Sequence, residues 1–246
     1  MVPYSPTPKP VSSVWRPDLT RLPVLTRSRR LVRRLFQILC RGIVLVCTKT
    51  TLHGLENYPR RGPALVVINH LGDPDAILAL AVLPDFPEVI GKIELRDIPA
   101  LRLVADLYGV IWIHRGHPDR RAISAALEAF RQGRRIIIAP EGRESVSGAL
   151  ESGTDGAAFL ALKAGVPVVP VTITGSEFRR IENNLKKLRR SLVTLKVGKP
   201  FILPPSARGQ DGLREATRII METLARQLPP AYRGVYAYVD KKGTSL

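Results

Sequence analysis

The sequence predicts an α/β fold with a mixed, largely parallel β-sheet flanked by helices. Short apolar runs of strand length recur along the chain, and segments with helical periodicity separate them. Parallel strands covered on both faces read as continuous apolar runs, as these do. The chain has 246 residues, of which 45% are hydrophobic, so it can bury one large core. No internal repeat or linker divides it.

The N-terminal part divides into two segments before the core begins. Residues 1–26 are rich in proline and lack an apolar core segment, so we expect a flexible tail. Residues 27–52 alternate arginines with apolar residues, which predicts a basic amphipathic helix followed by a short apolar one. Their longest apolar run is far shorter than the ~20 residues that span a bilayer. The segment can dock in a membrane interface or pack as an ordinary surface helix, and its many arginines favour the interface.

Residues 53–240 are expected to form the core of the protein as a single domain. Strands are predicted at 65–68, 88–93, 109–114, 135–139, 167–174 and 193–197, and helices at 76–82, 119–132, 155–164 and 211–228. Gly133 and Gly165 stand where helices commonly end, and Thr154 is placed to cap the third of these helices. A proline inside the run at 167–174 predicts an edge strand or a bulge.

The chain is strongly basic. Its net charge of +17 and pI near 10.6 indicate an anionic partner, which can be nucleic acid, an acidic membrane or a phosphorylated substrate. Aromatic residues make up only 6% and do not alternate with basic residues as in base-stacking surfaces, which argues against nucleic acid. Residues 179–190 have helical spacing and many basic side chains, and they form either a solvated helix or a second membrane or carrier contact.

His70 and Asp75 form the first candidate site. The apolar run before Asn69 breaks into a Gly-Asp-Pro turn, which places His70 at the carboxyl end of a buried strand. A helix that starts at or just after Pro74 could turn Asp75 back toward the imidazole, and such a pair can make a general base. The alternative is a plain capped helix, with Asp73 at the N-cap and Pro74 at the first position.

Two further blocks follow later strands. Arg115 leaves the run at 109–114 and would project into the same crevice as His70, where its planar donors suit phosphate. Glu141, Gly142 and Arg143 follow the run at 135–139, and Gly142 fits a tight turn whose amides could face an anion. Taken alone, these residues also fit a solvated strand-end arginine and an ordinary β-turn.

In their order along the chain, these blocks resemble the motifs of the glycerolipid acyltransferases, in particular the bacterial 1-acylglycerol-3-phosphate acyltransferases. The matching segments are Asn-His with an Asp five residues after the His, Gly109 to Gly116, Pro-Glu-Gly-Arg-Glu-Ser at 140–145, and Gly-Val-Pro-Val-Val-Pro-Val at 165–171. Two departures stand out. His114 occupies a position where Asp is frequent, and the third block lacks a Thr, so Glu144 takes the usual place of an Arg.

The resemblance implies a glycerol-3-phosphate acyltransferase-like fold and acyl transfer from acyl-CoA or acyl-ACP to the free hydroxyl of 1-acylglycerol-3-phosphate, giving phosphatidate in phospholipid biosynthesis. His70 would take the proton of the acceptor hydroxyl and Asp75 would orient His70. The acceptor and its phosphate would be bound by Arg115, Glu141, Gly142 and Arg143. Val166, Pro167 and Pro170 would form an apolar wall near the acyl donor.

No metal or bound cofactor is implied, since the acyl thioester is a co-substrate. The expected partners are a lysophospholipid, acyl-CoA or acyl carrier protein and an anionic membrane, without nucleic acid. The expected location is the cytoplasmic face of the cell membrane, as a peripheral or monotopic protein. Two alternatives stay open: an acyltransferase for another lysolipid or glycerol-3-phosphate, and a non-catalytic basic protein that binds membrane or nucleic acid.

Overall fold

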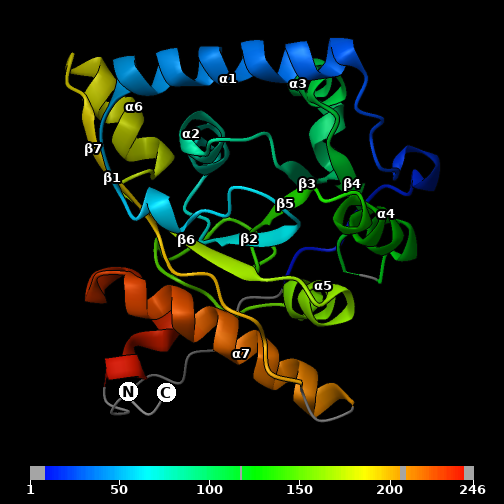
Figure 1. The fold of residues 1–246 in the computed structure, drawn as a ribbon. Coiled ribbons are helices and arrows are strands. Elements are labelled where there is room, and N and C mark those ends of the chain that lie inside the picture. The colour runs from blue at the N-terminus through cyan, green and yellow to red at the C-terminus, as the bar shows by residue number, and fades with distance from the viewer. Residues whose placement is uncertain (1–8, 117, 206–208, 241–246) are drawn as a thin grey trace.

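One seven-stranded β-sheet organises the chain, which a computed structural model describes for residues 9–116, 118–205 and 209–240. The strands are β1 (Thr48–His53), β2 (Ala64–Ile68), β3 (Glu88–Lys92), β4 (Ile111–Ile113), β5 (Arg135–Ile138), β6 (Val168–Thr174) and β7 (Ser191–Val197). They lie in the order β1-β7-β6-β2-β5-β3-β4 (Figure 1). β6, β2, β5, β3 and β4 are parallel, whereas β7 and β1 run in the opposite direction. The predicted fold class, a mixed and largely parallel sheet with helices, is confirmed.

Helices cover both faces of this sheet. They are α1 (Arg27–Cys47), α2 (Pro74–Val82), α3 (Pro99–Tyr108), α4 (Arg120–Arg131), α5 (Gly156–Ala164), α6 (Phe178–Lys186) and α7 (Gln210–Gln227). Buried residues of α1 and α2 form one core cluster with the sheet, and those of α4, α5 and α7 form the other. Figure 1 shows α1 and α2 above the sheet and α5 and α7 below it. Strand β2, between these layers, is buried along its whole length.

The predicted strands and core helices all occur, with ends within two residues of those expected. Three local interpretations were wrong. Residues 27–47 form one continuous helix instead of two, and Thr154 does not cap α5. The residue before α5 is Asp155, and the Thr154 hydroxyl donates a hydrogen bond to the carbonyl of Pro140 at 2.9 Å. The basic stretch after residue 178 is helical only to Lys186.

Pro170, for which an edge strand or a bulge was predicted, lies in an interior strand. Strand β6 pairs with β2 on one side and with β7 on the other. The antiparallel ladder with β7 begins at Val171, so the missing N–H of Pro170 falls just outside it. The carbonyl of Pro170 still accepts a hydrogen bond from Gly198 N at 2.8 Å. The antiparallel bridge between Val168 and Phe201 is shifted by one residue from the register of the β6–β7 ladder, so the segment after β7 holds one extra residue beside Pro170. The edge-strand alternative was wrong, whereas this shift agrees with the bulge.

Residues 9–26 do not behave as the expected flexible tail. Ser12 N donates to the Arg115 carbonyl at 3.0 Å, and Arg16 N donates to Nε2 of His114 at 2.9 Å. Residues 17–19 form a short 3-10 helix, and the Pro23 carbonyl accepts a hydrogen bond from Arg134 at 2.8 Å. This part of the N-terminal segment is thus fixed to the domain, while residues 1–8 lie outside the described ranges.

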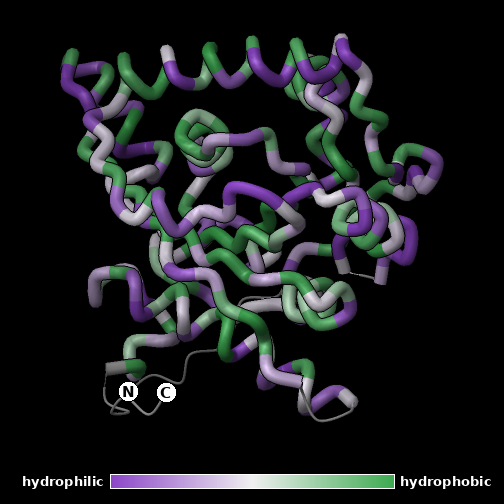
Figure 2. The backbone as a smooth tube through the Cα atoms, in the orientation of Figure 1, coloured by the Kyte–Doolittle hydropathy of each residue, from purple (hydrophilic) through white to green (hydrophobic). Residues whose placement is uncertain are grey.

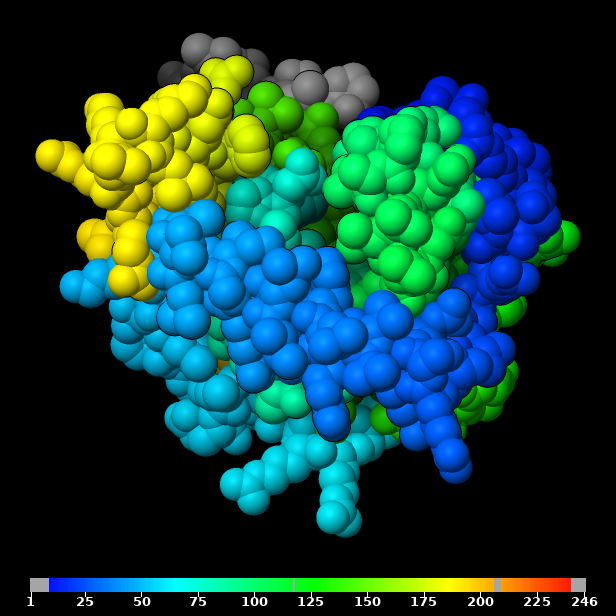
Figure 3. All heavy atoms as spheres, turned by 90° about the horizontal axis from the view of Figure 1, so that it is seen from above, coloured from blue at the N-terminus to red at the C-terminus, as the bar shows by residue number. Residues whose placement is uncertain are grey.

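Helix α1 exposes apolar side chains to solvent. Figure 2 shows hydrophobic and hydrophilic residues alternating along it, and Figure 3 shows α1 and α3 side by side on one face. Leu35 and Ile38 of α1 are 56% and 57% exposed, and Leu103 of α3 is 62% exposed. The large apolar side chains exposed on the two helices are Leu31, Leu35, Ile38, Leu39, Ile43, Leu45, Val46, Leu101, Leu103, Val104 and Leu107.

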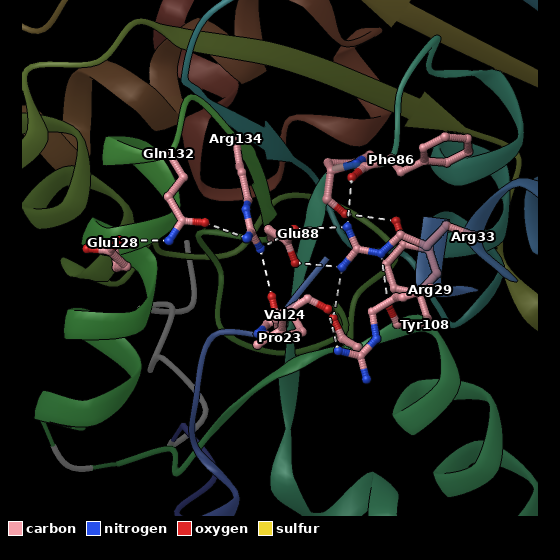
Figure 4. A network of polar contacts seen from close by, with 12 residues as sticks. Pro23, Val24, Arg29, Arg33, Phe86, Glu88, Tyr108, Glu128, Gln132 and Arg134 are labelled. Atoms are coloured by element: carbon pink, nitrogen blue, oxygen red, sulfur yellow. Dashed lines mark hydrogen bonds and ion pairs between the residues drawn. The ribbon is translucent and has the colours of Figure 1, made fainter. Parts of the chain in front are cut away.

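The first half of the inward face of α1 is polar because the buried Arg33 attaches it to the sheet, whereas Cys40 and Val44 of the second half pack in the core. Arg33 is 2% exposed and makes a bidentate ion pair with Glu88 of β3, at 2.9 and 2.7 Å (Figure 4). Its Nε donates to the Tyr108 carbonyl at 2.8 Å. Arg134 Nη1 also approaches Glu88, at 3.2 Å. This arginine, predicted to face lipid headgroups together with its neighbours, serves the fold instead.

We expect Arg33→Met to lower the free energy of unfolding by ~3–5 kcal/mol, because it leaves Glu88 buried with only the longer contact to Arg134. Urea denaturation measures the loss. The double variant Arg33→Met/Glu88→Leu should regain most of it, since no charge is then stranded. Arg34→Met is the matched control, because the neighbouring Arg34 is exposed. Equal stability of the Arg33→Met and Arg34→Met proteins would contradict this account.

Candidate active site

A cleft opens at the edge where β2, β3, β4 and β5 end. Because these strands are parallel, the residues that follow them meet at one edge of the sheet. The cleft has a volume of about 370 Å³. Four of the predicted site residues line it, namely His70, Arg115, Gly142 and Arg143, together with Asp73, Lys92 and Glu144. Their positions after predicted strands placed these residues near one another, and the structure brings them into one cavity.

The structure brings His70 and Asp75 into direct contact. His70 Nδ1 lies 3.0 Å from Oδ2 of Asp75, which is fully buried. The same oxygen accepts hydrogen bonds from Leu71 N at 2.6 Å and Gly72 N at 2.9 Å. Asp75 occupies the first turn of α2, where the N-terminal end of the helix favours a negative charge. Asp73 precedes the helix without a capping side-chain bond, so the carboxylate that organises this turn is Asp75.

Two residues outside the predicted site hold this pair in place. The Ser176 hydroxyl, which follows β6, donates a hydrogen bond to Oδ1 of Asp75. The Asn69 side chain donates to the Ile173 carbonyl and accepts from Ile173 N, both at 2.8 Å. Asn69 therefore ties the end of β2 to β6 and fixes the backbone from which His70 projects.

The surroundings of His70 adjust its basicity. Burial lowers its pKa, but the hydrogen bond and charge of Asp75, with the charges of Glu144 and Glu141, outweigh burial and raise the pKa above its ordinary value. Because an ionised Asp75 accepts from Nδ1, the neutral ring carries its proton there and leaves the lone pair on Nε2. The pair can thus act as a general base through Nε2 toward a group in the cleft.

Glu141 lies behind the cleft instead of lining it. It is 1% exposed, and its two carboxylate oxygens accept hydrogen bonds from His70 N at 2.9 Å and Glu151 N at 2.8 Å. Burial raises the pKa of Glu141 to about 7, although these two N–H groups oppose the rise. The prediction that Glu141 contacts an acceptor is therefore replaced by a role in positioning the His70 backbone.

Gly142 makes the turn that the sequence predicted. Its φ is +74°, and its N–H donates to the Ala139 carbonyl at 3.1 Å. A Cβ atom here would lie 3.2 Å from the Thr154 methyl group, so both backbone conformation and space favour glycine. Because the turn uses its N–H, Gly142 does not offer that donor to an anion.

The two arginines of the cleft are held differently. Arg143 donates from Nε to Oε2 of Glu151 at 2.7 Å, and its Nη2 lies 2.6 Å from the same oxygen. Arg115 makes a longer ion pair, 3.8 Å from Nη2 to Oε2 of Glu94. Within the described ranges, Arg115 Nε is buried without a hydrogen-bond partner. Arg115 is therefore the more available of the two for an incoming anion.

Glu144 places a carboxyl group where the resemblance predicts an arginine. Burial and the adjacent Asp73 carboxyl raise the pKa of Glu144, and the charge of His70 opposes that shift. Both acidic residues line the cleft. The cleft consequently holds carboxyl groups beside its cations, and a phosphate entering it must be bound by cations placed away from Glu144.

A second His–Asp pair has the same spacing but a closed environment. His114 Nδ1 lies 2.7 Å from Oδ2 of Asp119, five residues later, and Asp119 also caps α4. Here Nε2 accepts the N–H of Arg16, the Trp15 ring lies 4.5 Å from the imidazole, and His114 is 1% exposed. His70, by contrast, keeps 24% of its side chain exposed. His70 is therefore the candidate base, because a substrate in the cleft can reach its ring.

The predicted acyl-donor wall does not line this cleft. Val166 and Pro167 precede β6, and Pro167 accepts a hydrogen bond from Leu65 N at the start of β2. They therefore lie at the opposite edge of the sheet from His70, which follows the end of β2. Val166 packs in the core cluster under α7, and Pro170 sits within β6. These residues shape the core, and their assignment to the cleft is corrected.

Two other observations concern the described ranges. No helix there is both long and apolar enough to cross a bilayer. No group of three or more His, Cys, Asp or Glu side chains there is placed to hold a metal ion.

Comparisons with known proteins agree with the motifs. A family model described as Acyltransferase matches residues 49–174. A 1-acyl-sn-glycerol-3-phosphate acyltransferase of Brassica napus is 33% identical over 131 residues, covering 52% of this chain and 38% of the relative. The corresponding Salmonella typhimurium protein is 29% identical over 196 residues, covering 76% of this chain and 75% of the relative. The chain thus spans well under two thirds of the Brassica relative.

A solved structure has the same fold. The crystal structure of the 1-acyl-sn-glycerophosphate (LPA) acyltransferase PlsC from Thermotoga maritima superposes with a TM-score of 0.61 at 24% sequence identity. The superposition covers 90% of this chain and 86% of that chain. At this identity the similarity establishes the α/β architecture.

We expect Asp75→Asn to lower the pKa of His70, because the variant removes the adjacent charge while burial continues to disfavour the imidazolium. NMR titration of the histidine ring protons measures this shift. Asp119→Asn is the matched control and should leave the His70 titration unchanged. An unchanged or raised pKa of His70 in Asp75→Asn would show that the 3.0 Å contact does not control its basicity.

Proposed function

The chain belongs to the Acyltransferase family, and from that premise we propose that it transfers a fatty acyl group from an acyl thioester to the free hydroxyl of 1-acylglycerol-3-phosphate, forming phosphatidate. The observation that carries the proposal is the His70–Asp75 pair at the end of β2, with one ring nitrogen held by a buried carboxylate and the ring opening into a cleft. The printed names of the relatives support the acceptor. The donor, acyl-CoA or acyl-ACP, serves as co-substrate.

The proposed chemistry needs no protein nucleophile. His70 Nε2 takes the proton of the acceptor hydroxyl as its oxygen attacks the thioester carbonyl. The tetrahedral intermediate collapses, the C–S bond breaks as the new C–O ester bond is retained, and the imidazolium returns the proton to the leaving thiolate. Asp75 stabilises the imidazolium and keeps its orientation. Arg115 and Arg143 are proposed to bind the acceptor phosphate at the cleft wall.

A second acceptor class is favoured by one observation. Glu144 and Asp73 place two carboxyl groups in the cleft beside His70, and Glu144 stands where the resemblance predicts an arginine. These groups suit an acceptor whose headgroup carries a cation or hydroxyl donors next to its phosphate. Acyl transfer to another lysophospholipid is therefore the second candidate function.

We further propose that α1 and α3 place the enzyme on the cytoplasmic face of the cell membrane. The two helices that expose these apolar side chains lie side by side on one face (Figure 3), and α1 also exposes Arg27, Arg30, Arg34 and Arg41. Apolar side chains that enter the interface beside cations that attract anionic headgroups are typical of a helix lying in the membrane surface. A lysolipid could then reach the cleft without leaving the membrane.

Thiol release from a long-chain acyl-CoA tests the proposed reaction. We expect wild-type release to require lysophosphatidate, and His70→Ala to lower the rate by ~10²–10⁴-fold, the usual contribution of a general base. His53→Ala, at an exposed histidine of β1, is the matched control and should retain activity. Acceptor-independent release would point to a thioesterase. Failure with both donor types and with other lysolipids would favour a non-catalytic binding protein.

Vesicle flotation tests the membrane surface separately. We expect binding to vesicles that contain anionic lipid and a loss of more than tenfold in Leu35→Asp/Ile38→Asp, because each of these side chains contributes ~1.5–3 kcal/mol when buried. Ile202→Asp is the control, since Ile202 is 61% exposed after β7, away from α1. If both proteins bind alike, α1 is not the docking element.

A further inference from the structure

The N-terminal segment reaches the cleft. Residues 9–16, here called the strap, precede the region matched by the family model. Ser12 N donates to the Arg115 carbonyl at 3.0 Å, and Arg115 N donates to the Ser12 hydroxyl at 2.8 Å. At the other end of the strap, Arg16 N donates to Nε2 of His114 at 2.9 Å, and the Trp15 ring packs against the imidazole. The strap is thus fixed to the strand end that carries Arg115, and its first residues line the cleft.

Lys9 carries a cation into the cleft wall. Its Nζ lies 3.5 Å from Oε2 of Glu151, the carboxylate that holds Arg143. Within the described ranges this nitrogen is buried and has no hydrogen-bond partner, although 28% of the side chain is exposed. An ammonium group has three donors, and leaving them unpaired in a buried position is unfavourable. Its ion pair with Glu151 therefore leaves donors available for a further acceptor.

Arg115, which lines the same cleft, has a similar deficit. Its Nε is buried without a hydrogen-bond partner among the described residues, and its ion pair with Glu94 spans 3.8 Å. Since Ser12 joins the strap to the Arg115 backbone three residues after Lys9, both cations belong to one locally fixed unit. The oxygens of a phosphate group could satisfy both sets of donors.

We propose that the strap is part of the active site and that Lys9, with Arg115, binds the phosphate group of the acceptor. This inference rests on the proposed function and assigns the site that binds the headgroup of the acceptor. In the third motif Glu144 replaces the expected arginine, and Lys9 supplies a cation at another point of the cleft. Lys9 is a binding residue here, and the strap residues Ser12 and Trp15 position it.

The contacts favour the acceptor phosphate over a phosphate of coenzyme A. Lys9 contacts Glu151, whose N–H donates to Glu141 at 2.8 Å, and Glu141 accepts from His70 N at 2.9 Å. Lys9 therefore stands on the short chain of contacts that positions the proposed base. An acceptor whose hydroxyl meets His70 carries its phosphate only a glycerol unit away, in the same cleft that Lys9 lines.

Steady-state kinetics with both substrates varied tests the assignment. We expect Lys9→Ala to raise KM for lysophosphatidate roughly tenfold, the size of one charge-assisted hydrogen bond, with KM for acyl-CoA and kcat nearly unchanged. Lys9→Arg should restore most of the affinity. Ser12→Ala/Trp15→Ala should raise the same KM by loosening the strap. Lys199→Ala is the matched control, because Lys199 is exposed at the opposite edge of the sheet, beyond β7.

If Lys9→Ala raises only the KM for acyl-CoA, the assignment of Lys9 to the acceptor phosphate is wrong.

Binding of dodecyl phosphate without an acyl donor separates the two proposals. We expect the wild-type protein and Lys199→Ala to bind it equally, and Lys9→Ala to bind it roughly tenfold more weakly. If the wild-type protein transfers acyl groups while Lys9→Ala matches Lys199→Ala in both assays, the inference is wrong and the proposed function stands. If the wild-type protein binds dodecyl phosphate but transfers no acyl group, and Lys9→Ala weakens that binding, the proposed function fails and the phosphate site stands. If Lys9→Ala changes neither the KM for lysophosphatidate nor the binding of dodecyl phosphate, the phosphate site is wrong.

Discussion

One buried carboxylate, Asp75, organises the candidate active site. Its two oxygens accept hydrogen bonds from the His70 ring, the Leu71 and Gly72 amides and the Ser176 hydroxyl, and no part of it reaches solvent. Burying an ionised carboxylate is costly unless such donors and a helix N-terminus compensate. The arrangement therefore exists only when β2, the turn, α2 and the end of β6 are all in place. The carboxylate that raises the pKa of His70 is thus held by contacts that also join these elements.

A second buried ion pair decides which face of α1 meets solvent. Arg33 points inward to Glu88 in the first half of the helix, where Leu31, Leu35 and Ile38 are exposed, whereas Cys40 and Val44 of the second half pack in the core. In the first half of α1 this reverses the usual amphipathic arrangement, in which apolar residues face the core. A surface helix with no further partner gains nothing from such an arrangement, since exposed leucines add no stability in water. The exposed apolar face of α1 is understandable if it enters lipid.

Local patterns in the sequence predicted what depends on neighbours along the chain. Apolar runs marked the strands of the parallel sheet, and the five-residue spacing brought His70 and Asp75 together. Strand β1 was missed because its residues are mostly polar and exposed at the sheet edge. Ser176 and Glu151 could not be found in this way. Ser176 meets Asp75 across 101 residues of sequence, and Glu151 was not marked by any local motif. The strap was missed for the same reason, because proline-rich composition alone predicts a flexible segment.

The two His–Asp pairs show what such spacing can and cannot specify. In both, a strand ends at the histidine, a turn follows, and the aspartate five residues later lies at the start of a helix and binds Nδ1. The spacing thus builds an oriented imidazole twice. At His114 the strap occupies Nε2 and covers the ring, so the pair serves as an anchor for the N-terminal segment. At His70 the ring opens into the cleft. The local motif determines the geometry of the pair, and the segments packed around it determine whether that geometry can act on a substrate.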